Sequence, residues 1–424
     1  SGMADDFTIN NSLTVSSRAA MEGNYTIGGN GADFNSFGEA ADALNNAGVC
    51  GPTVFNVTSA IYLEQVYLTQ IPGASEVNTV TFQAASGNPA DVTLTFDADF
   101  SNNYLFLLDG TDYLTLRNLT LEATNDSYSR AIHLRNGADY NRFEDLDISG
   151  PVTTSTSDGM ALIYSDQNNN ASQNDDYNEF RRITLTNGAY GVYWYGYSTN
   201  VNEREQGTVF DSLTITNPYY MGMLVERQQS PKINHNQITQ TSTYSSQYGM
   251  YLQYCYGQLE ELRNRLDIRS GTAVYLYESD ATTSEKGLIA NNLITVAGGS
   301  TAIGIDHWYS DWHDVAHNSV HLFGEPTNGY AYRHNYGSND VVQNNIFANS
   351  GSGYAFYVTS SGYNLASDYN DLYAEGTNLA YWSGTNVSTL AQWQSTSGLD
   401  ANSFQERPVF ASDTGLSPIN SSLD

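Results

Sequence analysis

The stretches "LRNLTL" (116–121), "FEDLDI" (143–148), "FRRITL" (180–185) and "FDSLTI" (210–215) share one six-residue pattern. An apolar residue is followed by two variable residues, then leucine, isoleucine or asparagine, one variable residue and a second apolar residue. The pattern continues as "INHNQI" (233–238), "IANNLI" (289–294), "VAHNSV" (315–320) and "VQNNIF" (342–347), with weaker copies in "NRLDI" (264–268) and "DYNDLY" (368–373). The fourth positions lie 23 to 37 residues apart, mostly near 27, which is typical of a solenoid repeat.

A second strand pattern follows each copy, namely glycine or alanine, an apolar residue, a variable residue and another apolar residue. It reads "GVYW" (191–194), "GMYL" (249–252), "AVYL" (273–276) and "AIGI" (302–305). Two or three short strands per repeat predict an all-β chain folded as a right-handed parallel β-helix of roughly ten or more rungs. We expect the asparagines from Asn292 onward to stack at one corner and to bond the backbone along that column.

The repeats fill one domain, 1–424, without a linker. We divide it into an N-terminal arm (1–32), a capping helix (33–48), rungs (49–375), and C-terminal rungs with a cap (376–424). The helix is predicted because Phe34, Phe37, Ala41 and Leu44 fall on one face of "DFNSFGEAADALNNAG". A cap at the first rung would cover an otherwise open sheet edge.

The charge balance excludes several partners. The chain has 46 acidic and 16 basic residues, and its net charge is −30. Such a surface repels nucleic acid and anionic membranes, and no stretch reaches the ~20 apolar residues of a membrane span. We therefore expect a monomer without nucleic-acid binding or membrane insertion, and a glycan ligand that is neutral or is bridged by divalent cations.

The two cysteines, Cys50 and Cys255, are predicted to be unbonded. Cys50 follows the helix, whereas Cys255 lies at least five repeats later, and stacked rungs of ~4.8 Å place the two more than ~20 Å apart. A disulfide requires Cα atoms within ~7 Å.

The stretch "HDVAHNSVH" carries His313, His317 and His321 at a spacing of four, which on a helix would form one zinc-binding face. In an extended chain, residues four apart are separated by ~13 Å. Nitrogen ligands of one zinc ion must lie within ~4 Å of each other. We therefore expect no metal cofactor here and place these histidines at turns and on the surface. A calcium site at Asp166, Asp175 and Asp176 is a weaker alternative to a solvated loop.

Candidate site residues come from aligning neighbouring rungs. Alignment of "AIGIDHW" (302–308) with "GYAYRHN" (329–335) predicts Asp306 beside Arg333 and His307 beside His334, and it extends the same two columns to Tyr277 and Glu278. We assign as candidate catalytic residues Glu278, Asp306, His307, Arg333 and His334. The candidate substrate-binding residues on the same outer stripe are Tyr193, Tyr195, Glu226, Arg227, Tyr251, Gln253, Tyr275 and Tyr277.

Three interpretations of this stripe remain open. Tyrosines beside carboxylates suit sugars, because sugar rings stack on aromatic faces while polar groups bind hydroxyls. Glu226, Glu278 and Asp306 would supply the acid and base of a glycoside hydrolase. Alternatively, His307, Arg333 and His334 would neutralise a uronate and move its proton, as in a lyase. The third interpretation is a solvated face whose charges pair between rungs.

The ends of the chain carry a family resemblance. "ADFNSFGEAADALNNAG" (32–48) and "VFNVTSAIYLEQVYL" (54–68) resemble the first rungs of pectin-esterase-like and pectate-lyase-like β-helix proteins. "LDANSFQERPVFAS" (399–412) resembles the closing segment of secreted bacterial β-helix repeat proteins of the Bacteroidetes type. The resemblance implies a right-handed β-helix, an extracellular or cell-surface location reached through a signal peptide removed ahead of Ser1, and a polysaccharide or cell-surface glycan as partner.

The resemblance does not extend to a reaction. The catalytic segments of pectin esterases and the paired-aspartate, Gly-His-Gly and Arg-x-Lys motifs of polygalacturonases are not found in the chain. A non-catalytic adhesin or surface-structural module therefore competes with a glycoside hydrolase or polysaccharide lyase. The fold itself cannot decide between them.

Overall fold

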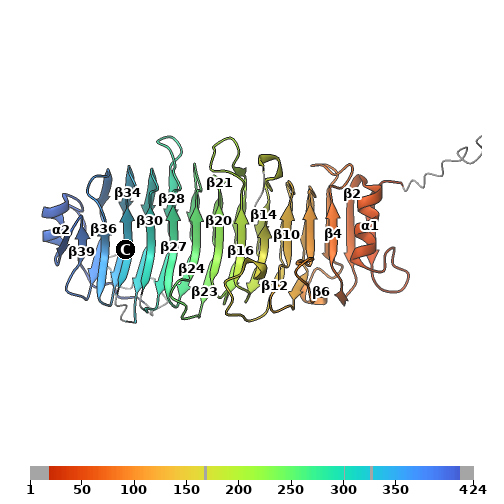
Figure 1. Ribbon diagram of the computed structural model, residues 1–424, viewed down its shortest axis with the longest axis horizontal. Coiled ribbons are helices and arrows are strands. Elements are labelled where there is room, and N and C mark those ends of the chain that lie inside the picture. The colour runs from red at the N-terminus through yellow and green to blue at the C-terminus, as the bar shows by residue number, and fades with distance from the viewer. Residues whose placement is uncertain (1–18, 167–169, 300, 325–327, 411–424) are drawn as a thin grey trace, which may run out of the picture.

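The computed structural model describes residues 19–166, 170–299, 301–324 and 328–410. The chain forms a parallel β-solenoid of about 13 turns, built from three long sheets and only two α-helices among the described residues (Figure 1). Each turn passes through sheets A, B and C in that order, and neighbouring turns pair in parallel.

Sheet A contains β1 (Met21–Ile27), β2 (Val49–Val57), β5 (Val80–Ala84), β8 (Leu114–Arg117), β11 (Arg142–Glu144), β14 (Glu179–Arg181), β18 (Val209–Asp211), β22 (Lys232–Asn234), β25 (Glu260–Leu262), β28 (Gly287–Ala290), β31 (His313–Ala316), β34 (Asp340–Gln343) and β37 (Leu365–Asp368). Sheet B contains β3 (Ala60–Leu63), β6 (Val92–Phe96), β9 (Thr120–Ala123), β12 (Asp147–Ser149), β15 (Thr184–Thr186), β19 (Thr214–Thr216), β23 (Gln237–Gln240), β26 (Arg265–Ile268), β29 (Leu293–Val296), β32 (Ser319–Leu322), β35 (Ile346–Asn349) and β38 (Asp371–Ala374).

Sheet C contains β4 (Val66–Thr69), β7 (Phe106–Asp109), β10 (Ile132–Arg135), β13 (Ala161–Ser165), β16 (Tyr190–Tyr195), β20 (Met221–Glu226), β24 (Tyr248–Gln253), β27 (Gly271–Tyr277), β30 (Ala302–Trp308), β33 (Gly329–Asn335), β36 (Gly353–Val358), β39 (Ala380–Trp382) and β40 (Thr385–Val387). The last pair, β39 and β40, is antiparallel. A small fourth sheet joins β17 (Glu205–Gln206) and β21 (Gln228–Gln229).

The six-residue sequence pattern spans a strand of sheet A, a tight corner and the start of a strand of sheet B. Its first, fourth and sixth residues point inward, as Leu116, Leu119 and Leu121 do in one turn. The third residue takes a left-handed backbone conformation, with φ between 52° and 61° at Asn118, Asp145, Arg182, Ser212, His235, Arg263, Asn291, His317, Asn344 and Tyr369. This repeated corner sets the turn length, which is why the pattern predicts the solenoid.

The predicted asparagine stack exists and is longer than expected. Its members are Asn236, Asn264, Asn292, Asn318, Asn345 and Asn370. At Asn318, the side-chain Nδ2 donates to the carbonyl of Ile289 at 2.9 Å, while Oδ1 accepts the backbone N–H of Asn292 at 3.0 Å. In the degenerate repeat "NRLDI" (264–268), the first residue, Asn264, occupies the ladder position.

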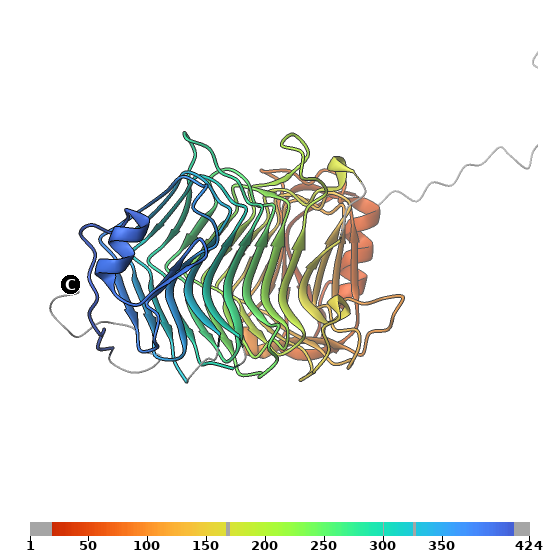
Figure 2. The same ribbon diagram turned by 60° about the vertical axis from the view of Figure 1, so that its left-hand side comes forward.

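Helix α1 (Phe37–Ala47) begins four residues later than the predicted helix and lies inside the chain. Ser36 is its N-cap and accepts the N–H of Glu39. Phe37, Ala41 and Leu44 are buried as expected, but Phe34 precedes the helix and bridges Ile27. The helix packs against β4 and lies at one end of the solenoid (Figure 2). Residues 21–27 of the predicted arm form β1, the edge strand of sheet A.

The far end of the solenoid carries a second short helix. Helix α2 (Leu390–Ser397) packs against β39 and β40 and buries Trp393. Residues 1–18 of the predicted arm and 411–424 of the predicted C-terminal region lie outside the described residues. Both cysteines are free as predicted, Cys50 exposed and Cys255 buried. In the described part of the chain, no helix has the length and apolar character to cross a membrane.

Candidate functional site

The outer face of sheet C carries long columns of tyrosine. Strand pairing places Tyr193, Leu224, Tyr251, Tyr275, Asp306, Arg333, Tyr357 and Tyr381 in one column. A second column contains Tyr195, Glu226, Gln253, Tyr277, Trp308 and Asn335. We call these two columns together the tyrosine face.

The rings on the tyrosine face touch one another from turn to turn. Ring centroids of Tyr251 and Tyr275 lie 4.9 Å apart, and those of Tyr357 and Tyr381 lie 4.3 Å apart. Around Tyr193 and Tyr195 these rings form an apolar cluster separate from the solenoid interior. The face therefore presents two pairs of tyrosine rings in contact between neighbouring turns, with Asp306 and Arg333 between the pairs.

The alignment of Asp306 with Arg333 and of His307 with His334 is confirmed. The extension to the preceding turn is wrong by two residues, because Tyr275, not Tyr277, pairs with Asp306. The reason is steric. Gly304, not Ala302, lies opposite Ala273, at a position where a Cβ would come within 2.2 Å of Val320. Only glycine fits there, so the strand is shifted by two residues from our alignment. A shift of two preserves the alternation of the strand, so the outward residues remain outward in new columns.

Asp306 and Arg333 form a nearly buried pair within the tyrosine face. The Nε of Arg333 donates to Oδ1 of Asp306 at 2.8 Å, Nη2 bonds Oδ2, and Nδ2 of Asn335 donates to Oδ1 at 3.2 Å. Asp306 is 1% exposed, whereas the Arg333 side chain is 21% exposed. The pair lines a depression of about 290 Å³ together with Tyr248, Tyr275 and Trp308. Asp306 is thus occupied in holding Arg333.

Glu226 is a different kind of carboxyl. It is 7% exposed, and burial raises its pKa, although neighbouring Arg227 opposes that shift. The Nε of Arg227 lies 3.4 Å from Oε1 of Glu226, and the guanidinium lies over the ring of Tyr195 at 4.5 Å. Burial thus favours the protonated form of Glu226, and the guanidinium of Arg227 favours the charged form.

Glu278 does not join these residues. It follows β27 at a corner with φ 44° and lies outside both columns. Its contact is with Tyr277, where a hydrogen bond to Glu278 raises the pKa of the tyrosine to about 12.

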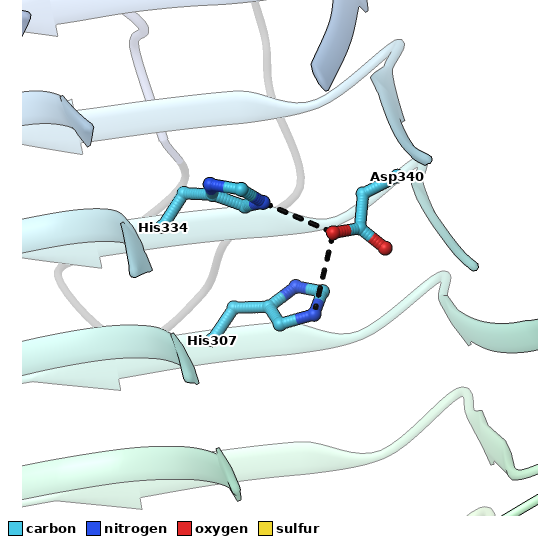
Figure 3. Close-up of side chains that lie close together, drawn as sticks. All are labelled: His307, His334 and Asp340. Atoms are coloured by element: carbon cyan, nitrogen blue, oxygen red, sulfur yellow. Dashed lines mark hydrogen bonds and ion pairs between the residues drawn. The ribbon is translucent and has the colours of Figure 1, made fainter. Parts of the chain in front are cut away.

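His307 and His334 point into the solenoid, not outward as we expected. Consecutive strand residues alternate, so Asp306 and Arg333 face out while His307 and His334, 0% and 1% exposed, face in. Inside, both approach Asp340, as Figure 3 shows. Burial lowers the pKa of His334 to about 4 and raises that of Asp340 to about 7. These residues are therefore not available to a ligand on the tyrosine face.

The histidine run is spread over two sheets, as its extended spacing predicted. His317 occupies an exposed corner, as expected, but His313 and His321 are buried. Among the described residues, the one group of three side chains close enough to share a metal ion is His307, His334 and Asp340. Residues 167–169, next to the predicted calcium ligand Asp166, lie outside the described residues.

One cluster was missed by the sequence analysis. Arg130, His133 and Arg135 line a depression of about 300 Å³ with Tyr67 and Tyr104. The guanidinium of Arg130 stacks 3.3 Å from the ring centroid of Tyr164. The signal was present in "RAIHLR" (130–135), which places three basic or imidazole side chains in one six-residue stretch.

No protein-family model matches the chain, and no curated protein matches it in sequence. A rhamnogalacturonan lyase structure is similar at 12% identity, with 76% of this chain and 87% of that chain covered and a TM-score of 0.43. An alginate lyase of family PL6 is similar at 10% identity, with 95% of this chain and 56% of that chain covered and a TM-score of 0.40. The pectin methyl esterase of the rice weevil is similar at 12% identity over 68% and 82%, with a TM-score of 0.34. At these identities and TM-scores, the likenesses bear on neither the substrate nor the activity of this chain.

Proposed function

We propose that the chain binds a polysaccharide along the tyrosine face of sheet C. The observation that supports this most is the turn-to-turn contact of tyrosine rings beside Glu226, Gln253, Arg333 and Asn335. Aromatic rings take sugar faces, and interleaved amides and charged groups take hydroxyls. Parallel strands repeat every ~4.8 Å, so the face offers a periodic surface to a periodic ligand.

The charge distribution supports a neutral glycan, or an acidic glycan bridged by divalent cations. Arginines on this side of the solenoid are already paired, Arg130 with Asp158, Arg227 with Glu226 and Arg333 with Asp306. The chain as a whole carries −30. A polyanion would meet long-range repulsion without an unpaired arginine among these three to offset it.

The proposal includes the handedness, the oligomeric state and the location of the protein. The solenoid is right-handed, as nearly all crossovers between parallel strands are. The protein acts as a monomer outside the cell or on its surface, where polysaccharides occur. The Bacteroidetes-type resemblance of "LDANSFQERPVFAS" (399–412) supports that location.

Cleavage of the bound glycan is the second candidate, and Glu226 favours it. Burial raises the pKa of Glu226, which is the direction of shift that a general acid requires. Without turnover, the chain is a non-catalytic adhesin with the same binding face.

The binding proposal is tested with a panel of neutral and uronate glycans, using isothermal titration calorimetry with and without calcium. Tyr251→Ala and Tyr275→Ala should each weaken binding by about 3- to 10-fold, the worth of one aromatic contact. Tyr140→Ala is the matched control, because Tyr140 is 43% exposed and stacks with Tyr113 and Tyr177 away from sheet C. Absence of binding to every glycan, or an equal loss in the control, contradicts the proposal.

Turnover is measured separately on any glycan that binds. Reducing ends report hydrolysis, and ultraviolet absorbance reports the unsaturated products of a lyase. Glu226→Gln should abolish turnover and leave binding nearly unchanged. If wild-type protein binds a glycan and releases no product, the adhesin alternative holds.

A further inference from the structure

Four polar side chains meet inside the solenoid at the corner between sheets C and A. Each of two successive turns contributes one pair, and both pairs have the same spacing of six residues. His307 lies near the C-terminal end of β30, and His313 is the first residue of β31. In the next turn, His334 lies near the C-terminal end of β33, and Asp340 is the first residue of β34. His307 and His334 are register partners on neighbouring strands, and their side chains lie one above the other (Figure 3).

These two turns form a polar island in an apolar column. The turn before places Leu276 beside His307 and Gly287 beside His313. The turn after places Val358 beside His334 and Leu365 beside Asp340. His307 and His313 are 0% exposed, and His334 and Asp340 are 1% exposed. Four ligand-type side chains are thus gathered in two turns and sealed on both sides.

The ligand atoms lie close to the spacing that one ion requires. Nε2 of His334 lies 3.0 Å and Nε2 of His307 lies 3.7 Å from Oδ2 of Asp340. Nδ1 of His313 lies 3.8 Å from Oδ1 of the same carboxylate. Atoms bound to a tetrahedral zinc ion at ~2.0–2.1 Å are ~3.3 Å apart. The ligand atoms of His307, His334 and Asp340 all lie within 4.8 Å of one another, whereas His313 stands outside this group.

One buried ring nitrogen of the cluster, Nδ1 of His334, has no hydrogen-bond partner among the described residues. Native proteins rarely leave buried polar atoms unpaired, so each such atom calls for a cause. Gly337 adds a second indication, because a Cβ there would lie 2.6 Å from Oδ2 of Asp340 and 3.2 Å from Nε2 of His334. A side chain at this position would fill the space beside the ligand atoms.

We propose that His307, His334 and Asp340 bind one Zn²⁺ ion. Two imidazoles and one carboxylate are a donor set that zinc prefers, and a water molecule completes four-coordination. His307 at present bonds the carbonyl of Ser310 through Nε2 and Tyr332 through Nδ1. Zinc binding moves the proton of His307 to Nδ1, which then donates to the hydroxyl oxygen of Tyr332 and orients the ring.

The ion has a structural role, since it joins two turns from the inside. Asp306 and Arg333 directly precede His307 and His334 on the same strands and project to the tyrosine face. Zinc at the interior corner therefore fixes the strands that carry this buried pair. The site is independent of the glycan proposal and is tested without a glycan.

The test is the zinc content of the full chain, purified after expression with added Zn²⁺ and measured by inductively coupled plasma mass spectrometry. Wild-type protein should hold about one zinc per chain, and removal by a chelator should lower the melting temperature until Zn²⁺ is restored. His334→Gln and Asp340→Asn should lower the zinc affinity by about 100-fold or more. His321→Gln is the matched control, because His321 is a buried histidine bonded to Ser350 outside the cluster.

A second readout keeps the test decisive if a variant does not fold. Co²⁺ added to the wild-type protein after chelation should give the visible absorption of a four-coordinate site, and Zn²⁺ should displace it. Wild-type protein that retains no zinc, gives no cobalt spectrum and shows no rise in melting temperature with Zn²⁺ overturns the proposal. Equal zinc content in His334→Gln and wild-type protein also overturns it.

Discussion

At the scale of single residues, burial decides what each charged group can do. Asp306 and Arg333 were predicted as neighbours, but an exposed ion pair and a buried one differ in energy. An exposed pair contributes ~0.2–1 kcal/mol, whereas removal of one member of a buried pair leaves an uncompensated charge. The Asp306 side chain is 2% exposed and is also bonded to Asn335, so this pair is of the second kind.

Asp306→Ala should therefore destabilise the protein strongly, by about 2–4 kcal/mol. The measurement is the thermal unfolding midpoint by circular dichroism. Asp314→Ala is the control, because Asp314 pairs with Lys286 at 2.7 Å with both side chains about one third exposed. The control should lose ~1 kcal/mol or less. Similar midpoints for the two variants would show that water hydrates the guanidinium of Arg333 in Asp306→Ala and offsets the lost ion pair.

The two thiols should differ sharply in reactivity. Cys50 is exposed, while Cys255 is fully buried and burial raises its pKa. Because the thiolate is the reactive form, the folded protein should react with iodoacetamide at Cys50 alone. Unfolding in denaturant without reductant should expose two titratable thiols. Peptide mass spectrometry distinguishes the sites, and labelling of Cys255 in the folded state would contradict the buried placement.

At the scale of elements, the asparagine ladder stabilises the corner between sheets A and B. The side chain of Asn318 satisfies two backbone groups of the preceding turn, the carbonyl of Ile289 and the N–H of Asn292, so truncation leaves both unpaired. Leucine or isoleucine occupies the same corner in earlier turns, at Leu119, Leu146, Ile183 and Leu213. Leucine cannot replace an asparagine within the ladder without loss, because the backbone N–H of Asn292 needs Oδ1 of Asn318 as its acceptor.

Asn318→Ala should cost about 2–4 kcal/mol, since it removes the bonds to Ile289 and to Asn292 from a fully enclosed corner. The thermal midpoint again reports the loss. Asn364→Ala serves as control, because exposed Asn364 makes one side-chain bond to Asn339 and none to the ladder. A midpoint for Asn318→Ala equal to that of the control would mean that water replaces the ladder bonds.

The sequence predicted the element pattern well because the corner repeats. The left-handed corner residue and the inward positions around it recur at nearly constant spacing, so turns and sheets could be counted from them. Register within sheet C was harder. Both Ala302 and Gly304 fit the small-residue position, and only the contact of Gly304 with Val320 decides between them.

The candidate site was predicted in part for a related reason. Adjacency of Asp306 with Arg333 follows from alignment alone, but alignment does not show which face a residue takes. His307 and His334 face inward, and Asp340 and His313 reach them from another sheet across the interior. Contacts between sheets depend on the corner geometry, which a one-dimensional repeat does not specify.

At the scale of the whole molecule, the acidic composition extends into the interior. Burial raises the pKa of Glu261 to about 8 and that of Asp139 to about 7. Glu261 lies inward on β25 between Ile233 and Ile289, where neighbouring turns place apolar side chains. Glu261 is therefore mostly protonated in the folded protein near neutral pH and ionised in the unfolded chain.

The sign of the resulting pH dependence follows from proton binding. Above the ordinary histidine pKa of ~6.5, histidines are neutral in both states, so the buried carboxyls dominate. A carboxyl whose folded pKa is raised binds its proton more tightly in the folded state. Its contribution to stability is full below the unfolded pKa and is lost as pH rises through the folded pKa. The growing negative charge of the chain acts in the same direction.

The protein should therefore become less stable between pH 6.5 and pH 9, with Glu261 alone responsible for about 2 kcal/mol. Below pH 6.5 the trend reverses in part, because burial lowers the pKa of His307 and His334 and protonation then favours the unfolded chain. Glu261→Gln keeps the shape of the side chain and removes its titration, so this variant should show a shallower alkaline decline in melting temperature. Glu260→Gln, on the partly exposed neighbour that faces away from the interior, should retain the wild-type slope. Parallel melting curves for wild-type protein and Glu261→Gln across this range would show that Glu261 is ionised within the solenoid at neutral pH.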